Sequence, residues 1–486
     1  MNAHNQGINA QDKDNEFIHD CKVITIESGY EIVGCFHCVI LKQDNCNELD
    51  HIEQHIEQLG QQFKRIVCRE TLEAADENNA RLFKLAQPRL RKNGKSPFTI
   101  ITRFGRIRLK RQRMFDSQTG KTLTPSAIVW ETSQNSHITR QVIDAACEAS
   151  QAVSYRKAAK QLADESGEEK LLSTTTVWNK KQMIGKELEQ KQNHFAEQAL
   201  AYFAEQVPMQ DTMILSEMPL EKSSLEEVAT DAKPCRIAEN TIQAQLDEVV
   251  TKSQEPGKKT NLTYTATLET SEGECIYLAE KSSQELIQQV MAHLMMLGLF
   301  FGKRWEVISD GARWIGEWVD SMTDREQCDP QSVEVEHVLC WYHLCKRIYE
   351  GLGAVGLTKD KRKELEREIL GHLWRGETAQ SVWRLWGLRS SARVPQRIDD
   401  LMGYLLRKRR MIVNYAARRE QGLWLASTRV EKWNDVAVSE RCKHRGMSWT
   451  SQGVLAIALY AAEQKRKSKQ ITNQTDQFHL DGHMTP

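Results

Sequence analysis

The order of strands and helices in the middle of the chain limits its possible folds more than any other feature. Three strand-like segments (TIQAQLDEV, NLTYTATLE and GECIYLAE) follow one another from residue 241, separated by the turn sequences PGKK and SEGE, and apolar residues alternate in the first two. A helix over residues 282–302, the strand WEVIS, a short helix (GARWIGEWVDSM) and a fifth strand (VEVEHVLCWYH) come next. We therefore expect an α/β domain with three antiparallel strands and two further strands joined by helices.

This strand order is that of a ribonuclease-H-like fold, in which the first and fourth strands lie side by side. Asp247 ends the first predicted strand, Asp310 ends the fourth, and Glu431 begins a predicted helix late in the chain. Taken alone, an aspartate at a strand end is usually a turn former, and a helical glutamate is usually a solvated charge. On this strand order, however, the three carboxylates converge and form a candidate site.

Three acids at one point repel one another unless cations lie between them. Carboxylate oxygens are the ligands that Mg²⁺ or Mn²⁺ prefers, and such ions activate a water or a 3′-hydroxyl for in-line displacement at phosphorus. Glu248, next to Asp247, and Asp435, one helical turn after Glu431, are alternative ligands if the register differs.

The rest of the chain divides by composition into an N-terminal α+β region, helical segments and a polar tail. The expected parts are an N-terminal region with a β-hairpin at 97–111 (1–130), a helical DNA-binding domain (131–200), an acidic linker (201–240), the first part of the core (241–343), an all-helical insertion (344–426), the C-terminal helices of the core (427–464) and a disordered tail (465–486).

The helical domain has the pattern of a helix-turn-helix. SYRKAAKQLADESG predicts one helix that ends at Gly167, and Ser173 is a suitable N-cap for the next. In such a motif the second helix enters the major groove, so we expect it to present residues to DNA. These residues are Thr174, Thr175, Asn179, Lys180 and Lys181. An ordinary helical hairpin is the alternative.

Charge is balanced overall but clustered locally. The 66 basic and 66 acidic residues cancel, yet residues 88–115 hold ten Lys or Arg and no acid, and residues 401–470 hold fifteen against five acids. Two basic blocks that flank a candidate catalytic region favour a polyanionic partner over a merely solvated surface.

The N-terminus lacks a signal-peptide pattern and the most apolar run, 290–302, is too short to span a bilayer, so we expect a soluble protein with reduced cysteines.

Several strings resemble those of bacterial insertion-sequence transposases of the ISKra type, relatives of the Mutator-like DDE transposases. They are LDEVVTK, VISDGARWI, VLCWYHL and STRVEKWNDVAVSERCKHRGMSWTSQG. The resemblance is good over about residues 240–465 and looser over 95–190. It places the two aspartates of that family on Asp247 and Asp310, its glutamate on Glu431, and its Cys/Asp-x-x-His signature on Cys340 and His343.

The resemblance implies a transposase that binds the terminal inverted repeats of its insertion sequence and catalyses Mg²⁺- or Mn²⁺-dependent DNA cleavage and strand transfer. It further implies double-stranded DNA as partner, a homodimer or larger oligomer, and a cytoplasmic, nucleoid-associated location in a bacterium. His343, at the end of the fifth predicted strand, is expected beside the metal site, and Cys340 is expected to pack. Residues near the third carboxylate are expected to hold the DNA backbone: Arg429, Lys432, Arg441, Lys443, His444 and Arg445.

Two other functions and one other metal site stay open. A ribonuclease-H-like nuclease or resolvase would use the same carboxylates without strand transfer, and an inactive remnant would only bind DNA. Cys35, Cys38, His51 and His55 have the spacing of a zinc finger, although Lys42 and Leu49 do not fit the apolar positions of such a finger.

Overall fold

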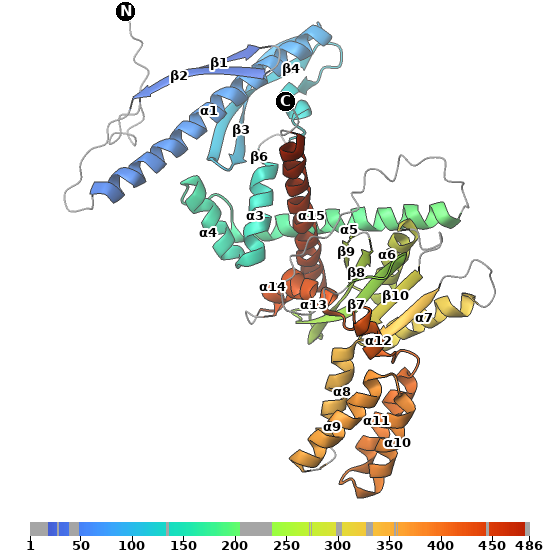
Figure 1. Ribbon diagram of the computed structural model, residues 1–486. Coiled ribbons are helices and arrows are strands. Elements are labelled where there is room, and N and C mark those ends of the chain that lie inside the picture. Colours follow the sequence, from blue (N-terminus) through green and yellow to red (C-terminus); the bar gives the residue numbers. More distant parts are fainter. Residues whose placement is uncertain are drawn as a thin grey trace, which may run out of the picture. The chain divides into compact units, whose positions relative to one another are not determined.

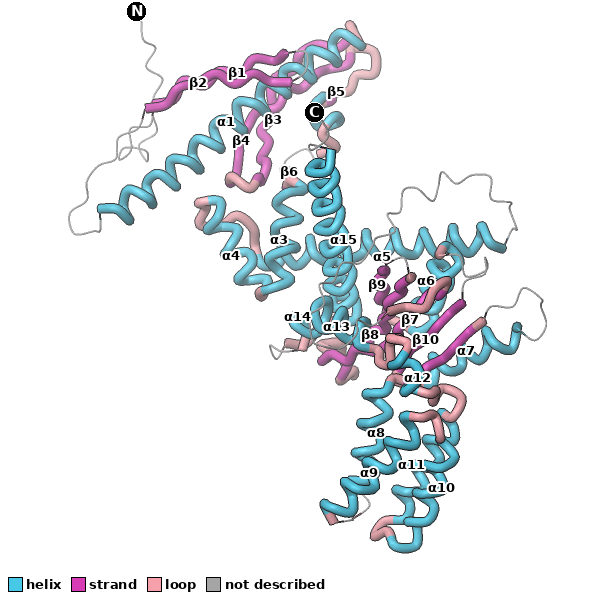
Figure 2. Tube along the Cα trace, viewed as in Figure 1, coloured by secondary structure: helices cyan, strands magenta, loops and turns pink. Residues whose placement is uncertain are grey.

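The computed structural model describes residues 18–26, 29–37, 48–132, 136–204, 236–271, 273, 275–297, 304–326, 334–353, 356, 358–443 and 447–481. The chain divides into two compact units, Met1–Lys181 and Gln182–Pro486. Figures 1 and 2 show their helices and strands. Across these described ranges, none of the helices is both long enough and apolar enough to span a membrane.

The first unit begins with two β-hairpins and a long helix. Strands β1 (Ile18–Ile26) and β2 (Gly29–His37) pair antiparallel, and α1 (Glu48–Ala86) follows. The second hairpin, β3 (Leu90–Thr102) and β4 (Gly105–Asp116), contains the one predicted from the alternation at 97–111. Two short strands, β5 (Thr122–Leu123) and β6 (Ser136–Ile138), complete a sheet of order β5-β4-β3-β6.

Four helices follow, and the end of one and the start of the next are at the predicted residues Gly167 and Ser173. They are α2 (Pro125–Val129), α3 (Arg140–Ala152), α4 (Tyr155–Ser166) and α5 (Thr174–Ala204). Gly167 ends α4 in the left-handed conformation, with a φ of 65° that favours glycine. The Ser173 hydroxyl accepts a hydrogen bond from the Thr176 backbone N–H at 3.0 Å, and so caps α5.

A five-stranded sheet forms the centre of the second unit. Its strands are β7 (Thr241–Lys252), β8 (Thr260–Thr270), β9 (Cys275–Glu280), β10 (Arg304–Ser309) and β11 (Val335–Leu339). Their order is β11-β10-β7-β8-β9. The first three strands along the chain pair antiparallel, whereas β10 runs parallel to both β7 and β11. Each strand matches a segment of alternating or continuous apolar residues in the sequence.

Both faces of this sheet are covered. Ile242, Ala244 and Leu246 of β7 point to the side of α6 (Ser283–Met296) and α7 (Arg313–Glu326), where they join one apolar core. The intervening Gln243 and Gln245 are also buried, on the side of the C-terminal helices. These helices are α13 (Thr428–Asn434), a π-helical turn at Asp435–Ser439, α14 (Glu440–Cys442) and α15 (Ser451–Asp481).

Within its described residues the insertion has helices and connecting turns, and its apolar core continues into Ile308, Val338 and Leu339 of the strands β10 and β11. Its helices are α8 (Trp341–Gly353), α9 (Lys359–Trp374), α10 (Thr378–Leu388), a 3₁₀ turn (Arg389–Ser391), α11 (Pro395–Lys408) and α12 (Tyr415–Glu420). Figure 1 shows α8 to α11 side by side, and leucine and isoleucine side chains fill the space between them.

The expected boundaries of the fifth strand and of the C-terminal tail differ in the structure. The fifth strand ends at Leu339, because its partner β10 stops at Ser309, and the chain then turns into α8, so that His343 is helical. The expected disordered tail continues α15 as far as Asp481. That stretch is rich in Lys and Gln, which favour helix, and neither Gly nor Pro interrupts it between residues 454 and 481.

Candidate functional site

Two aspartates lie at matching positions of neighbouring parallel strands, one inside β7 and the other just beyond the end of β10. Leu246 of β7 is in register with Ser309 of β10, and the next residues are Asp247 and Asp310. Asp247 lies inside β7, which continues to pair with β8 as far as Lys252, and not at the strand end as expected. Asp310 does follow the end of β10, where Gly311, with a φ of 81°, turns the chain toward α7.

Helix α13 carries Glu431 in its first turn, and β7 holds the start of this helix. The Gln245 side-chain oxygen accepts hydrogen bonds from the backbone N–H groups of Arg429 (2.9 Å) and Val430 (3.4 Å). Gln245 lies two residues before Asp247, so both side chains point to the same face of the sheet. The Ser427 hydroxyl donates to Glu431 Oε1 at 2.8 Å. The same strand therefore carries one acid and anchors the helix that carries another.

The charges of Asp310 and Glu431 act on the buried carboxylate of Asp247. Burial is the main reason why the pKa of Asp247 is raised, and the charges of Asp310 and Glu431 raise it further. The Asn434 amide opposes this shift by donating to Asp247 Oδ2 at 2.9 Å, and the Tyr277 hydroxyl in turn donates to Asn434 at 3.1 Å. A cation between the carboxylates would relieve this repulsion.

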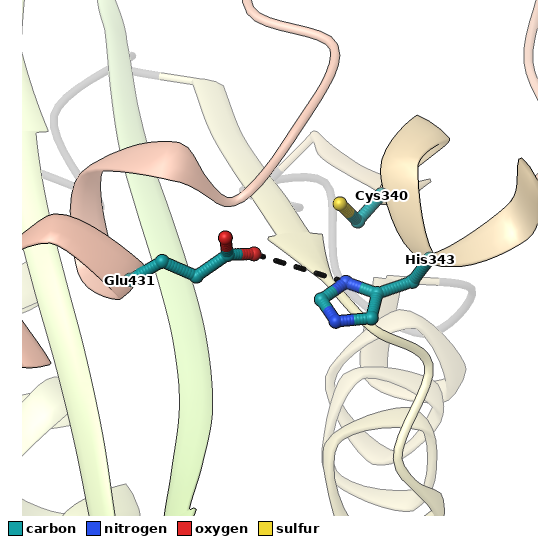
Figure 3. A group of neighbouring side chains, drawn as sticks. All are labelled: Cys340, His343 and Glu431. Atoms are coloured by element: carbon teal, nitrogen blue, oxygen red, sulfur yellow. Dashed lines mark ion pairs between the residues drawn. The ribbon is translucent and has the colours of Figure 1, made fainter. Parts of the chain in front are cut away.

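A second group of side chains meets at Glu431. Cys340, His343 and Glu431 each direct one ligand atom to a common point, and these atoms lie within 4.8 Å of one another (Figure 3). His343 Nδ1 is 3.8 Å from Glu431 Oε1. Asp247, Asp310 and Glu431 are not all within that 4.8 Å limit of one another in the described residues.

The histidine and the thiol of this group perturb each other. The pKa of His343 is raised, chiefly by the neighbouring Cys340 side chain and also by the charges of Glu431 and Asp310, although burial opposes the shift. Burial disfavours the Cys340 thiolate, but the His343 imidazole and the Ser427 backbone N–H, 3.4 Å from Sγ, outweigh it, so that the pKa of Cys340 is lowered. Cys340 is fully buried, as a packing residue should be.

Of the two alternative ligands, Glu248 points to the opposite face of the sheet, and Asp435 is exposed. Glu248 accepts a hydrogen bond from the Trp314 indole N–H on the opposite face of β7, because neighbouring residues of a strand alternate in direction. Asp435 is exposed at the start of the π-helical turn, and the charges that act on Asp247 are those of Asp310 and Glu431. The geometry therefore favours Asp247 and Glu431 over these neighbours.

Lys408 is a site residue that the sequence did not indicate. At the end of α11, its ammonium group donates to the Gly311 carbonyl at 2.6 Å. Burial lowers the pKa of Lys408, whereas the charge of Asp310 opposes that shift. The insertion thus brings a cation to the turn that carries Asp310. Nothing in the local sequence around residue 408 reveals this contact, since it forms only in the tertiary structure.

The second helix of the predicted DNA-reading motif exposes some of the expected residues. Thr174, Thr175 and Asn179 are exposed, and Lys180 is half-buried. The expectation for Lys181 was wrong, because its side chain is buried and its ammonium group donates to the Cys147 carbonyl at 3.1 Å. Lys181 lies one helical turn after the buried Val177, and so faces the interior.

Two arginines near Glu431 also differ from the expectation that they hold DNA. Arg429 Nε is 3.4 Å from Glu269 Oε1, and its guanidinium lies over the Trp424 ring. Arg441 is buried and lies over the Trp449 ring, 4.7 Å from its centroid. Lys432 and Lys443 are exposed as expected.

Several expected residues lie outside the described part of the structure. His444 and Arg445 of the basic group are among them, and so is Cys38 of the zinc-finger spacing. The side chains of Cys35 and His51 are also outside it, so the zinc hypothesis for this segment stays a prediction.

Comparison with known families covers the first third of the chain. Residues 42–200 match the family model of an uncharacterised protein family (UPF0236). No curated protein matches the chain. The match includes α1, the β3–β4 hairpin, α3, α4 and most of α5, and it ends before the sheet that carries the acidic residues. The chain thus shares its N-terminal part with this uncharacterised family.

Proposed function

We propose that the protein is a DNA transposase of the DDE type, with Asp247, Asp310 and Glu431 as its catalytic carboxylates. The observation that carries this proposal is that Asp247 and Asp310 directly follow Leu246 of β7 and Ser309 of β10, which pair in register, while Glu431 lies on the helix that β7 anchors. Phosphoryl transfer needs acids in this arrangement, and a turn-forming or surface role does not.

We further propose that the second unit contains a ribonuclease-H-like core. The strand order β11-β10-β7-β8-β9 and the antiparallel pairing of its first three strands along the chain support this assignment. So does the location of α6 and α7 on one face of the sheet and of α13 on the other. The all-helical insertion leaves the core after β11 and returns before α13.

Asp247, Asp310 and Glu431 would hold Mg²⁺ or Mn²⁺. Their oxygen donors suit these hard cations, and the charges of Asp310 and Glu431 add to the burial that raises the pKa of Asp247. When bound, such ions activate the attacking hydroxyl or water and stabilise the leaving oxygen. Asn434 would orient Asp247, and Ser427 would orient Glu431. His343, whose Nδ1 is 3.8 Å from Glu431 Oε1, would contact the scissile phosphate.

The proposed substrate is double-stranded DNA at the terminal repeats of the element and at the target. The support for this partner is the pair of basic blocks and the exposed residues of α5 (Thr174, Thr175 and Asn179). Lys432 and Lys443 are exposed beside the site and would contact the DNA backbone. Cutting two ends together requires a homodimer or larger assembly, in the cytoplasm at the nucleoid of a bacterial host.

The test is an assay in which the purified protein, with Mg²⁺ or Mn²⁺, cleaves DNA that contains the sequences flanking its gene and joins the cut ends to a second DNA. We expect nicking at the repeat ends and joining to a second DNA, both abolished in Asp310→Asn. Asp435→Asn is the matched control, because it removes an exposed acid of the same region and should keep both activities. Cleavage without joining would assign a nuclease or resolvase, and specific binding without cleavage would assign an inactive remnant.

A further inference from the structure

The Cys340, His343 and Glu431 group offers a different set of ligands from the three carboxylates. Cys340 follows β11, and its carbonyl accepts the first helical hydrogen bond of α8, from the Leu344 N–H at 3.0 Å. His343 lies three residues later, so both side chains emerge on the same side of that first turn. Glu431 approaches from α13 (Figure 3). Sulfur and imidazole nitrogen are ligands that Zn²⁺ accepts readily and Mg²⁺ does not.

Two of these ligands share one supporting residue. The Ser427 backbone N–H donates to Cys340 Sγ at 3.4 Å, and the Ser427 hydroxyl donates to Glu431 Oε1 at 2.8 Å. Ser427 is itself only 1% exposed. An N–H group that donates to sulfur stabilises a thiolate, and hydrogen bonds of this kind orient the ligands of metal sites. Ser427 therefore orients the side chains of Cys340 and Glu431.

The histidine has an unused ligand atom. His343 Nδ1 is buried and has no hydrogen-bond partner within the described part of the chain, although it points toward Glu431 Oε1 at 3.8 Å. A buried nitrogen without a partner is destabilising, and a bound cation would satisfy it. Tetrahedral Zn²⁺ needs ligand atoms about 3.5 Å apart, so side chains that lie within 4.8 Å need to move by only about 1 Å.

We propose that Cys340, His343 and Glu431 bind Zn²⁺ in preference to Mg²⁺, with the fourth position open, and that this withdraws Glu431 from the catalytic carboxylates and inhibits cleavage. The binding rests on the geometry of these three side chains alone. The inhibition rests on the proposed function, because Glu431 belongs to both groups of ligands. Zinc would thus act as an antagonist of the hard cation at this site.

The binding test uses Co²⁺ as a spectroscopic substitute for Zn²⁺ on the full-length protein in excess Mg²⁺. We expect a thiolate-to-cobalt absorption band that is lost in Cys340→Ala and weakened at least roughly tenfold in apparent affinity in His343→Gln. Cys345→Ala is the matched control, since it removes a nearby thiol that is not part of the group. Asp247→Asn should keep the band.

The difference between wild type and Cys340→Ala isolates this site from any other cysteines that bind cobalt. Thermal unfolding of each variant checks that it folds, and His343→Gln, a half-buried position, serves if Cys340→Ala does not. Identical cobalt spectra in wild type, Cys340→Ala and His343→Gln would overturn the proposal.

The inhibition test compares the cleavage rate of each protein with and without micromolar Zn²⁺ at millimolar Mg²⁺. The wild-type rate should fall, and Cys340→Ala should need at least roughly tenfold more Zn²⁺ for the same fractional loss. Equal sensitivity of both proteins would refute inhibition through this site. If the protein cleaves no DNA, the proposed function fails, while the cobalt spectra still decide the metal site.

Discussion

Replacing Arg418 by methionine should strongly destabilise the second unit, because Arg418 compensates a buried charge. The guanidinium of Arg418 in α12 donates to Glu306 Oε2 of β10 at 2.6 Å, and both side chains are 6% exposed. The other Glu306 oxygen accepts from Gln243 at 2.6 Å, and Gln243 accepts from Gln245 at 2.8 Å. These buried hydrogen bonds connect α12 of the insertion to Gln245, whose side chain accepts from the first backbone N–H groups of α13.

The magnitude follows from the loss of one partner. Removing one member of a buried ion pair costs about 3–5 kcal/mol, since the other charge stays desolvated. The double replacement Glu306→Leu/Arg418→Met removes both charges and should cost only about 1–3 kcal/mol, mainly for the amide of Gln243 that loses its acceptor. Arg419→Met, at the next and exposed position, should cost less than about 1 kcal/mol.

Urea unfolding followed by tryptophan fluorescence measures these differences. Ten of the twelve tryptophans lie in the second unit, so the signal reports mainly on that unit. For a slope of about 2–3 kcal/mol/M, the midpoint of Arg418→Met should fall by roughly 1–2.5 M urea. A drop no larger than that of Arg419→Met, or a double variant less stable than the single one, would refute this reasoning.

Three further predictions concern pH and salt. Burial, reinforced by neighbouring glutamates, raises the pKa of Glu280 from 4.5 to about 8. The stability that protonated Glu280 contributes is therefore complete below pH 4.5 and is lost as the pH rises through 8. Glu280→Gln should flatten the fall in unfolding temperature between pH 5 and 9. Asn434→Ala removes a hydrogen bond that lowers the pKa of Asp247, so the acid limb of the pH–rate profile should move to higher pH, and an unmoved limb would contradict this role. Lys180→Ala should reduce the slope of log binding constant against log salt concentration by about 0.9 for DNA, whereas Lys181→Met, at a buried position, should leave it unchanged. Equal slopes for the two variants would refute the assignment of Lys180 to the DNA-facing side of α5.

The sequence predicts the strands of the second unit well because their apolar residues alternate with a period of two. Ile242, Ala244 and Leu246 mark the face of β7 that meets α6 and α7. The same alternation does not reveal that Gln243 and Gln245 are buried under the C-terminal helices. The sequence pattern thus determines which residues share a face, but not whether a polar face is covered.

The errors in the candidate site have a common physical origin. Lys181 was assigned to DNA from its place in the second helix of the predicted motif, and Arg429 and Arg441 from their place near Glu431. Each of the three instead contacts a carbonyl, a carboxylate or an aromatic ring inside the protein. Long cationic side chains bury their methylene groups whenever such a partner is available. Local sequence does not show the partner, since Cys147 and Glu269 lie far away along the chain.

The place of Lys408 in the site could not be predicted either, because its partner is also distant along the chain. Its contact with Gly311 joins the insertion to the β10–α7 turn, two segments that only the fold brings together. Asn434, by contrast, lies one helical turn after Glu431, so its position on that face of α13 was available from the sequence.

A change of metal preference tests most directly whether Asp310 is a metal ligand in phosphoryl transfer. Asp310→Cys places a thiolate, which binds Mg²⁺ poorly and Mn²⁺ better, where the carboxylate stood. We predict that this variant cleaves the element ends with Mn²⁺ but not with Mg²⁺, while the wild-type protein uses both and Asp310→Asn uses neither. Equal cleavage by Asp310→Cys with the two ions, or cleavage by Asp310→Asn, would contradict the assignment of Asp310 to the metal site.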